Sequence, residues 1–263
     1  MRPRTMATFT FPLIKLQMFF LIFLRVTAIM MSIPVFDSKT IPVIFKAGLA
    51  FSISIMLFPL IKIDEIPDFS NIITFGIGII GEIMFGLIIG MFVRMIFAGI
   101  QLAGQLAGYQ MGLAIANVLD PATSGQFPII SQIYNLIAML IFITINAHHW
   151  FLRAIKESFT LVPPLGFHFS SSLADQLVSL SGNIFVIAVK VGAPIIVVLL
   201  LTSVAFGLIA RTVPQMNVFI VAMPLKIAVG LLFLILSIPY LVVFLRQIFH
   251  DFGSSIIFLM KAM

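Results

Sequence analysis

The sequence contains no cysteine, and only 9% of its 263 residues are charged. The missing thiols exclude structural disulfides, a thiol nucleophile and a cysteine-ligated metal. The net charge is +6, but the basic residues are scattered singly, so no basic patch is present that could bind nucleic acid. A long polar stretch is also missing, which leaves no room for a soluble domain of useful size. We therefore expect one integral-membrane domain over residues 1–263.

Catalytic motifs are missing as well. The sequence has no phosphate-binding lysine motif and no serine nucleophile motif, and its acidic residues are too scattered for a paired-carboxylate site. His148 and His149 are adjacent, but neighbouring residues on a helix point in different directions and no further ligand lies nearby. We expect neither an enzyme nor a cofactor or metal site.

Apolar residues are what the sequence has in excess: 61% are hydrophobic, and the mean hydropathy is +1.22. This composition is typical of a polytopic membrane protein. We predict an all-α protein with about six long, partly broken helical regions at about 11–33, 41–61, 72–116, 128–152, 171–211 and 217–246. As a helix, the third region would measure roughly 68 Å, against a hydrocarbon core of about 30 Å. It must either bend back or leave the bilayer.

The positions of the basic residues bear on topology and on buried charge. Near the ends of the six regions they fall seven to two, which predicts that both termini are cytoplasmic. Glu82 and Arg94 lie deep within the third region, where a charge costs about 2.5 to 3.5 kcal/mol unless a partner or a water-filled path surrounds it. Internal ion bridges that hold a bundle together and a functional pathway explain these two residues equally well.

Glycines recur at four-residue spacing along the third region. The positions are Gly86, Gly90, Gly104, Gly108 and Gly112. Small residues at this spacing let helices approach closely in a membrane. Packing within the chain is the better explanation for any single glycine. Because the stripe is long for one chain to cover, we expect part of it to face another subunit.

A second informative stretch lies between the fifth and sixth regions. Pro214 and Asn217 interrupt two strongly apolar segments, and Arg211 and Lys226 lie on either flank. Irregular backbone at membrane depth requires protein or water to satisfy its polar groups, and broken helices of this kind form transporter sites. A plain loop between two helices explains the stretch equally well.

Several stretches together resemble a known family. "FLRVTAIMMSIPVF", "GQLAGYQMG", "INAHHWFLRAIKESF" and "GLIARTVPQMNVFIVAMPLKIAVGLL" are similar to the FliR family of type III export-gate proteins. The resemblance runs from about Phe20 to about Gly253, and the adjacent histidines and the intact "PQMNVF" favour the flagellar branch over the virulence-secretion branch.

The resemblance implies a non-enzymatic channel subunit in the bacterial inner membrane, within the flagellar basal body. It would assemble with FliP and FliQ, beside FlhB, and pass unfolded flagellar proteins across the membrane, without binding nucleic acid. The main alternative is an ion-coupled secondary transporter that uses the broken helix near Pro214 and the charges of Glu82 and Arg94.

The resemblance also assigns a plug for the closed channel to the loop after the third region, here residues 109–127. From the residues alone, a short surface loop is the favoured explanation of this stretch. The residues of this predicted plug and gate are Tyr109, Gln110, Met111, Asn117, Asp120, Pro121, Thr123, Ser124, Gly125 and Phe127.

Overall fold

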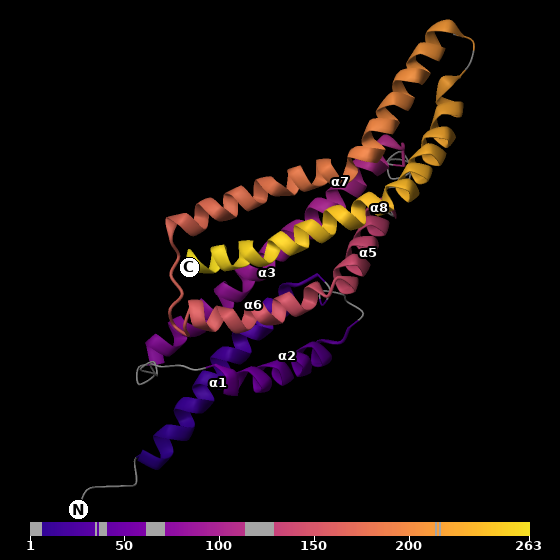
Figure 1. The fold of residues 1–263 in the computed structure, drawn as a ribbon. Helices are drawn as coiled ribbons and strands as arrows, with labels where there is room; N and C mark the ends of the chain where they lie inside the picture. Colours follow the sequence, from indigo (N-terminus) through magenta and orange to yellow (C-terminus); the bar gives the residue numbers. More distant parts are fainter. Residues whose placement is uncertain are drawn as a thin grey trace, which may run out of the picture. The chain divides into compact units, whose positions relative to one another are not determined.

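The structure is a computed structural model that describes residues 7–34, 36, 41–61, 72–113, 129–213, 215 and 217–263. Within these ranges the secondary structure is helical and contains no strand (Figure 1). The elements are α1 (Ala7–Ser32), α2 (Val43–Leu57), the short 3-10 helix η1 (Phe58–Leu60), α3 (Ile72–Gln110), α5 (Ile129–Thr144), α6 (Ala147–Leu161), α7 (Ser171–Thr212) and α8 (Val218–Lys261). The prediction of an all-α protein is confirmed.

Five of these helices are long and apolar enough to cross a membrane, or six if the bent pair α5 and α6 counts as one crossing. This confirms the class of polytopic membrane protein. The helices α3, α7 and α8 contain 39, 42 and 44 residues. At about 1.5 Å per residue, each is roughly twice as long as the hydrocarbon core of a bilayer is thick.

The structure corrects three predicted helix boundaries. A bend of 68° separates α5 from α6, where a single helix over 128–152 was expected. Asn146 takes the left-handed conformation there, with φ of 57°, which a continuous helix does not accommodate. The helix α8 continues well beyond residue 246. In that extension Phe249, Ile256 and Leu259 are buried, so tertiary packing sustains the helix.

The third boundary concerns α3, which ends at Gln110 instead of reaching residue 116. Gly112 has φ of +84° and lies after the helix, so it is not the next member of a helical glycine stripe as we expected. The Gly112 N–H donates to the Tyr109 carbonyl and the Leu113 N–H donates to the Gly108 carbonyl, at 3.0 and 3.1 Å. This is the Schellman arrangement, in which a glycine ends a helix because it lacks the Cβ that would clash.

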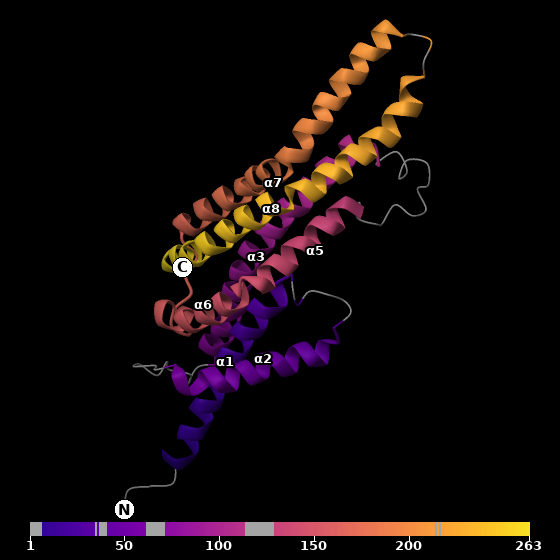
Figure 2. The same ribbon diagram turned by 45° about the vertical axis from the view of Figure 1, so that its right-hand side comes forward.

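The chain divides into two compact units. Unit 1 comprises Met1–Arg94, His148–Ser179 and Asp251–Met263, and unit 2 comprises Met95–Ala147 and Leu180–His250. In unit 1, α1 and α2 lie side by side (Figure 2), and the ring of Phe51 meets those of Phe19 and Phe23 edge-on, with centroids 5.5 and 6.0 Å apart.

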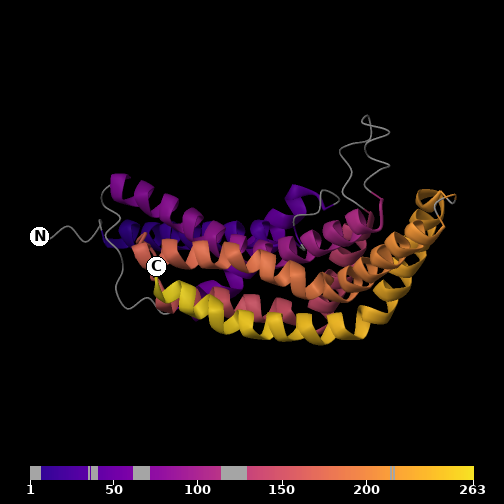
Figure 3. The same ribbon diagram turned by 90° about the horizontal axis from the view of Figure 1, so that it is seen from above.

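Unit 2 has an aromatic core of its own. Phe97 of α3, Phe142 of α5 and Phe249 of α8 contact one another, with ring centroids 5.2 to 6.0 Å apart. The parts of α7 and α8 that belong to this unit run side by side as a helical hairpin (Figure 3). The Tyr240 hydroxyl of α8 donates to the Lys190 carbonyl of α7 at 3.2 Å.

The glycines of α3 make close helix contacts inside the chain. A Cβ atom on Gly86 would overlap Ala28 of α1, and one on Gly90 would overlap Ser32 of the same helix. A Cβ on Gly104 would lie 2.9 Å from the Ser131 nitrogen and 3.1 Å from the Ile130 carbonyl oxygen, both on α5. Packing within the chain therefore explains these three glycines, and our expectation that part of the stripe faces another subunit finds no support in them. Gly108 is buried as well.

We predict that Gly104→Ala destabilises the purified protein by about 1–3 kcal/mol, because the new methyl group meets backbone atoms that cannot move aside. Gly207→Ala is the matched control, since it changes a helical glycine with no atom within 4 Å of the added Cβ. Alanine is favoured over glycine in a helix by about 1 kcal/mol, so the control should be neutral or slightly stabilising. Thermal unfolding in detergent measures both, and equal midpoints for the two variants would contradict the prediction.

Candidate functional site

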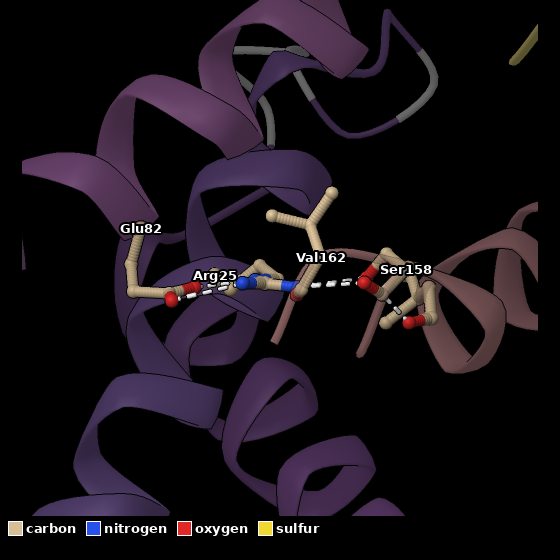
Figure 4. A network of polar contacts seen from close by, with 5 residues as sticks. Arg25, Glu82, Ser158 and Val162 are labelled. Atoms are coloured by element: carbon tan, nitrogen blue, oxygen red, sulfur yellow. Dashed lines mark hydrogen bonds and ion pairs between the residues drawn. The ribbon is translucent and has the colours of Figure 1, made fainter. Parts of the chain in front are cut away.

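The most extensive polar site that the structure describes is in unit 1, around Arg25 of α1. The Arg25 side chain is fully buried, and Glu82 of α3 is 1% exposed. The Arg25 Nε donates to Glu82 Oε2, and the Arg25 Nη2 donates to Glu82 Oε1 at 2.8 Å (Figure 4). The contact is therefore bidentate, which is the strongest geometry for an arginine and a carboxylate.

The remaining terminal nitrogen of Arg25 reaches the end of α6. Arg25 Nη1 donates to the Val162 carbonyl at 2.8 Å and to the Ser158 carbonyl and hydroxyl oxygens at 3.1 and 3.3 Å. Carbonyls in the last turn of a helix lack partners within that helix, and they carry partial negative charge. Arg25 therefore caps α6 as well as neutralising Glu82.

Two aromatic rings complete the surroundings of the guanidinium. The Arg25 Cζ atom lies 4.4 Å from the ring centroid of Phe85 in α3 and 4.3 Å from that of Phe159 in α6. Both distances are within the range of a cation–π interaction. Arg25 thus meets a carboxylate, carbonyl oxygens and two π faces, and it joins α1, α3 and α6 in one network.

This geometry accounts for the buried charge of Glu82. Glu82 forms an internal ion bridge, as one of the two explanations expected, and its partner is Arg25, which sequence reasoning did not single out. The signal that sequence reasoning missed is an arginine near the middle of the first apolar run, at a depth where a long side chain needs a partner.

Arg94, the second charge of the third region, is not buried inside the chain, and its depth in a membrane stays a prediction. Its side chain is exposed, and its Nε donates to the carbonyl of Ser32, the last residue of α1, at 2.8 Å. Glu82 and Arg94 are 12 residues apart on α3, roughly 18 Å along the axis, which is too far for a direct contact. Arg94 is therefore not the residue that pairs with Glu82.

The interrupted stretch after α7 connects two helices. Residues 213, 215 and 217 are non-helical, Arg211 and Asn217 are exposed, and Lys226 is half-buried in α8. Pro214 lies outside the described residues. The Asn217 carbonyl accepts a hydrogen bond from the Ile220 N–H at 3.1 Å, in the first turn of α8. The choice between a plain connection and a transporter site at this stretch stays a prediction.

The structure describes three residues of the predicted plug and gate, all at the end of α3. Tyr109 is exposed and Gln110 is half-buried, while Met111 is fully buried and lies near Gly230 of α8. The other seven lie outside the described residues: Asn117, Asp120, Pro121, Thr123, Ser124, Gly125 and Phe127. The assignment of a plug to this segment stays a prediction.

The two longest helices leave most of their apolar surface uncovered. Only 28% of the apolar span in α7 and 22% of that in α8 is buried. Their exposed residues include Leu200, Leu208, Ile235 and Val243, each more than half exposed. Apolar surface of this extent is covered by lipid or by other subunits. The architecture is that of a membrane-embedded chain with extensive apolar surface available for contacts.

Comparison with known proteins assigns this architecture to a family. The chain matches the family described as "Bacterial export proteins, family 1" over residues 16–252 and belongs to it. The flagellar biosynthetic protein FliR of Bacillus subtilis (strain 168) is 36% identical over 237 residues, which cover 88% of this chain and 90% of that protein. FliR of Pectobacterium carotovorum is 31% identical, covering 89% and 88%, and FliR of Escherichia coli (strain K12) is 29% identical, covering 90% of each. The resemblance to the FliR family is confirmed.

We predict that the effect of removing Glu82 changes sign when Arg25 is removed as well. Glu82→Leu alone leaves a buried unpaired cation and should cost about 3–5 kcal/mol of stability. In an Arg25→Met background, the same Glu82→Leu change removes an unpaired carboxylate and should be stabilising. Thermal unfolding of the four purified proteins tests this as a double-mutant cycle.

The exposed ion pair of α6 is the control for this cycle. Arg153 Nε lies 2.9 Å from Glu157 Oε1, and the Arg153 side chain is 79% exposed. Replacing either partner should cost at most about 1 kcal/mol. Additive effects of the Arg25 and Glu82 substitutions would show that the buried pair is not coupled as the geometry requires.

Proposed function

We propose that this chain is a channel subunit of the flagellar type III protein export gate. Its partners would be FliP and FliQ, with FlhB as a neighbour, and its cargo would be unfolded flagellar proteins. The observation that carries the proposal is the family match over residues 16–252, which includes helices of both compact units. The relatives reported above are named flagellar biosynthetic proteins, and the shared length extends over nearly the whole chain.

The uncovered helices support assembly with other subunits. A channel wall built from several chains requires each chain to have uncovered faces that can pack against its neighbours, and in a membrane such faces can be apolar, with side-chain packing holding them together. The apolar spans of α7 and α8 have such faces. The bacterial inner membrane, at the flagellar basal body, is the location that this function requires.

Purification under mild conditions tests the proposal. An affinity-tagged chain, produced at its normal level in a motile host, should bring down FliP and FliQ in one complex. A strain that lacks the chain should stop secreting flagellin, and the restored gene should recover secretion. A chain that purifies as a monomer or a small homo-oligomer, from a host that secretes normally without it, would refute the export-gate function.

A second prediction concerns the plug that we propose for residues 109–127. Deleting Ala122 to Gly125 should make the closed gate leak ions and small solutes, because the segment that blocks the channel is shortened. The variant should still accumulate and still associate with FliP and FliQ, since the deletion leaves the described helices and their contacts intact. Conductance of the purified complex in planar bilayers measures the leak.

The wild-type complex at a matched amount is the control for the leak. A transporter loop would instead change the uptake of one solute without general permeability. If the assembled deletion variant conducts no more than the wild type, the plug assignment is wrong and the segment only connects two helices.

A further inference from the structure

The helices of unit 2 differ in the chemistry of their exposed faces. On α5, Leu136 and Leu140 are 60% and 65% exposed, and on α7 Leu200, Leu201 and Val204 are more than half exposed. On α8, Leu232, Ile235, Leu236 and Val243 are exposed to a similar extent. Lipid tails or apolar side chains of other subunits can cover these three faces without a cost in lost hydrogen bonds.

The part of α3 in unit 2 presents polar side chains instead. Gln101, Gln105 and Tyr109 follow at four-residue steps and therefore share one face of the helix over about 12 Å. Tyr109 is 56% exposed, and the two glutamines are half-buried. The opposite side of the same helix is packed inside the unit, where Ala103, Ala107 and other small or apolar residues are buried. The side of α3 that the unit leaves open therefore includes the polar strip of Gln101, Gln105 and Tyr109, with the half-buried Leu102 and Leu106 beside it.

Side-chain amides on a helix face need hydrogen-bonding surroundings. Moving an amide from water into an apolar medium without a compensating partner costs roughly 2–7 kcal/mol, depending on the reference medium. Lipid tails offer glutamine no partner, so this face is not a lipid-facing surface. Water does offer partners, and it does so for every rotamer of the side chain.

The face also carries no charge. An arginine or lysine there would indicate contact with lipid phosphates or acidic groups, and a carboxylate would favour binding of cations. Neutral amides and a phenol hydrogen-bond to water and to any passing peptide group without strong selection. These properties suit a surface along which unfolded polypeptides of different sequence have to move.

We propose that the face of α3 formed by Gln101, Gln105 and Tyr109 borders the water-filled path through the export gate, while the exposed leucines of α5 and α7 are covered by lipid or by other subunits. This inference rests on the proposed function, because the path exists only in the assembled gate. The proposal specifies which side of unit 2 contacts water and which sides are covered by lipid or by other subunits.

The absence of cysteine from the chain provides a direct test. Single variants Gln101→Cys, Gln105→Cys and Tyr109→Cys are compared with Leu136→Cys and Leu140→Cys in membranes that contain the assembled gate. The probe is a negatively charged, membrane-impermeant methanethiosulfonate reagent, applied to vesicles of both orientations. The reagent reacts with the thiolate, which forms in water and is suppressed in apolar surroundings.

The bare chain and the proposal predict opposite orders of reactivity. By exposure in the chain alone, Leu136→Cys and Leu140→Cys should label faster than the half-buried positions 101 and 105. In the assembled gate we expect positions 101, 105 and 109 to label at least about tenfold faster than the two leucine positions, because a charged reagent does not enter apolar surroundings. Faster labelling at the leucines, or no labelling at the three α3 positions, would overturn the proposal.

A second pair of variants keeps the test decisive if a cysteine variant fails to accumulate. Gln105→Glu places a charge where we expect water and should leave the amount of chain in the membrane and its co-purification with FliP and FliQ within about twofold of wild type, whereas Leu140→Glu places the charge in apolar surroundings and should abolish both. Loss of accumulation and co-purification in Gln105→Glu with both retained in Leu140→Glu would overturn the proposal. Co-purification of the wild-type chain with FliP and FliQ is measured in parallel. If the gate assembles and exports but shows the wrong labelling order, only the proposal that this face of α3 borders water is refuted. If the wild-type chain fails to assemble with FliP and FliQ, the proposed function is refuted.

Discussion

The bidentate contact between Arg25 and Glu82 is the interaction on which the packing of unit 1 depends. Removing two opposite charges from water is expensive, and the cost is offset only when both groups find complete sets of partners. Glu82 has both its oxygens engaged by Arg25, and the guanidinium uses its remaining donors on carbonyls at the end of α6. Because each partner comes from a different helix, the network allows one relative placement of α1, α3 and α6 and disfavours others.

Close approach of backbones is the second requirement of this architecture. Gly86 and Gly90 let α3 lie against α1 on the same segment that contains Glu82, so the ion pair and the glycine contacts specify the same helix pairing. In unit 2, Gly104 has the same role for α3 and α5. Leucine-rich surfaces alone would not select a register, since apolar contacts are non-directional. Glycine contacts and the buried charge together supply that selection.

The distribution of exposed residues connects the fold to membership of the export family. A chain with most of the apolar spans of α7 and α8 uncovered is suited to be one part of a larger wall, and its family consists of bacterial export proteins. The open face of α3 in unit 2 differs in being polar, at Gln101, Gln105 and Tyr109. The channel subunit that we propose would need surfaces of both kinds, because it would contact apolar neighbours and also border water.

The sequence by itself determined the class of protein, the approximate helical regions and the family. Hydropathy is a local property, and each apolar run must form a helix because backbone groups in lipid have no other way to hydrogen-bond. The sequence misplaces the end of α3, because the four-residue spacing predicts Gly112 as a further member of the helical glycine stripe, whereas in the structure it ends the helix. Only the tertiary structure decided that the helix between 128 and 152 bends at Asn146, that Arg94 is exposed, and that Glu82 pairs with a residue 57 positions away. Those features depend on which helix faces meet, and a periodic apolar pattern leaves that choice open because many pairings bury similar area.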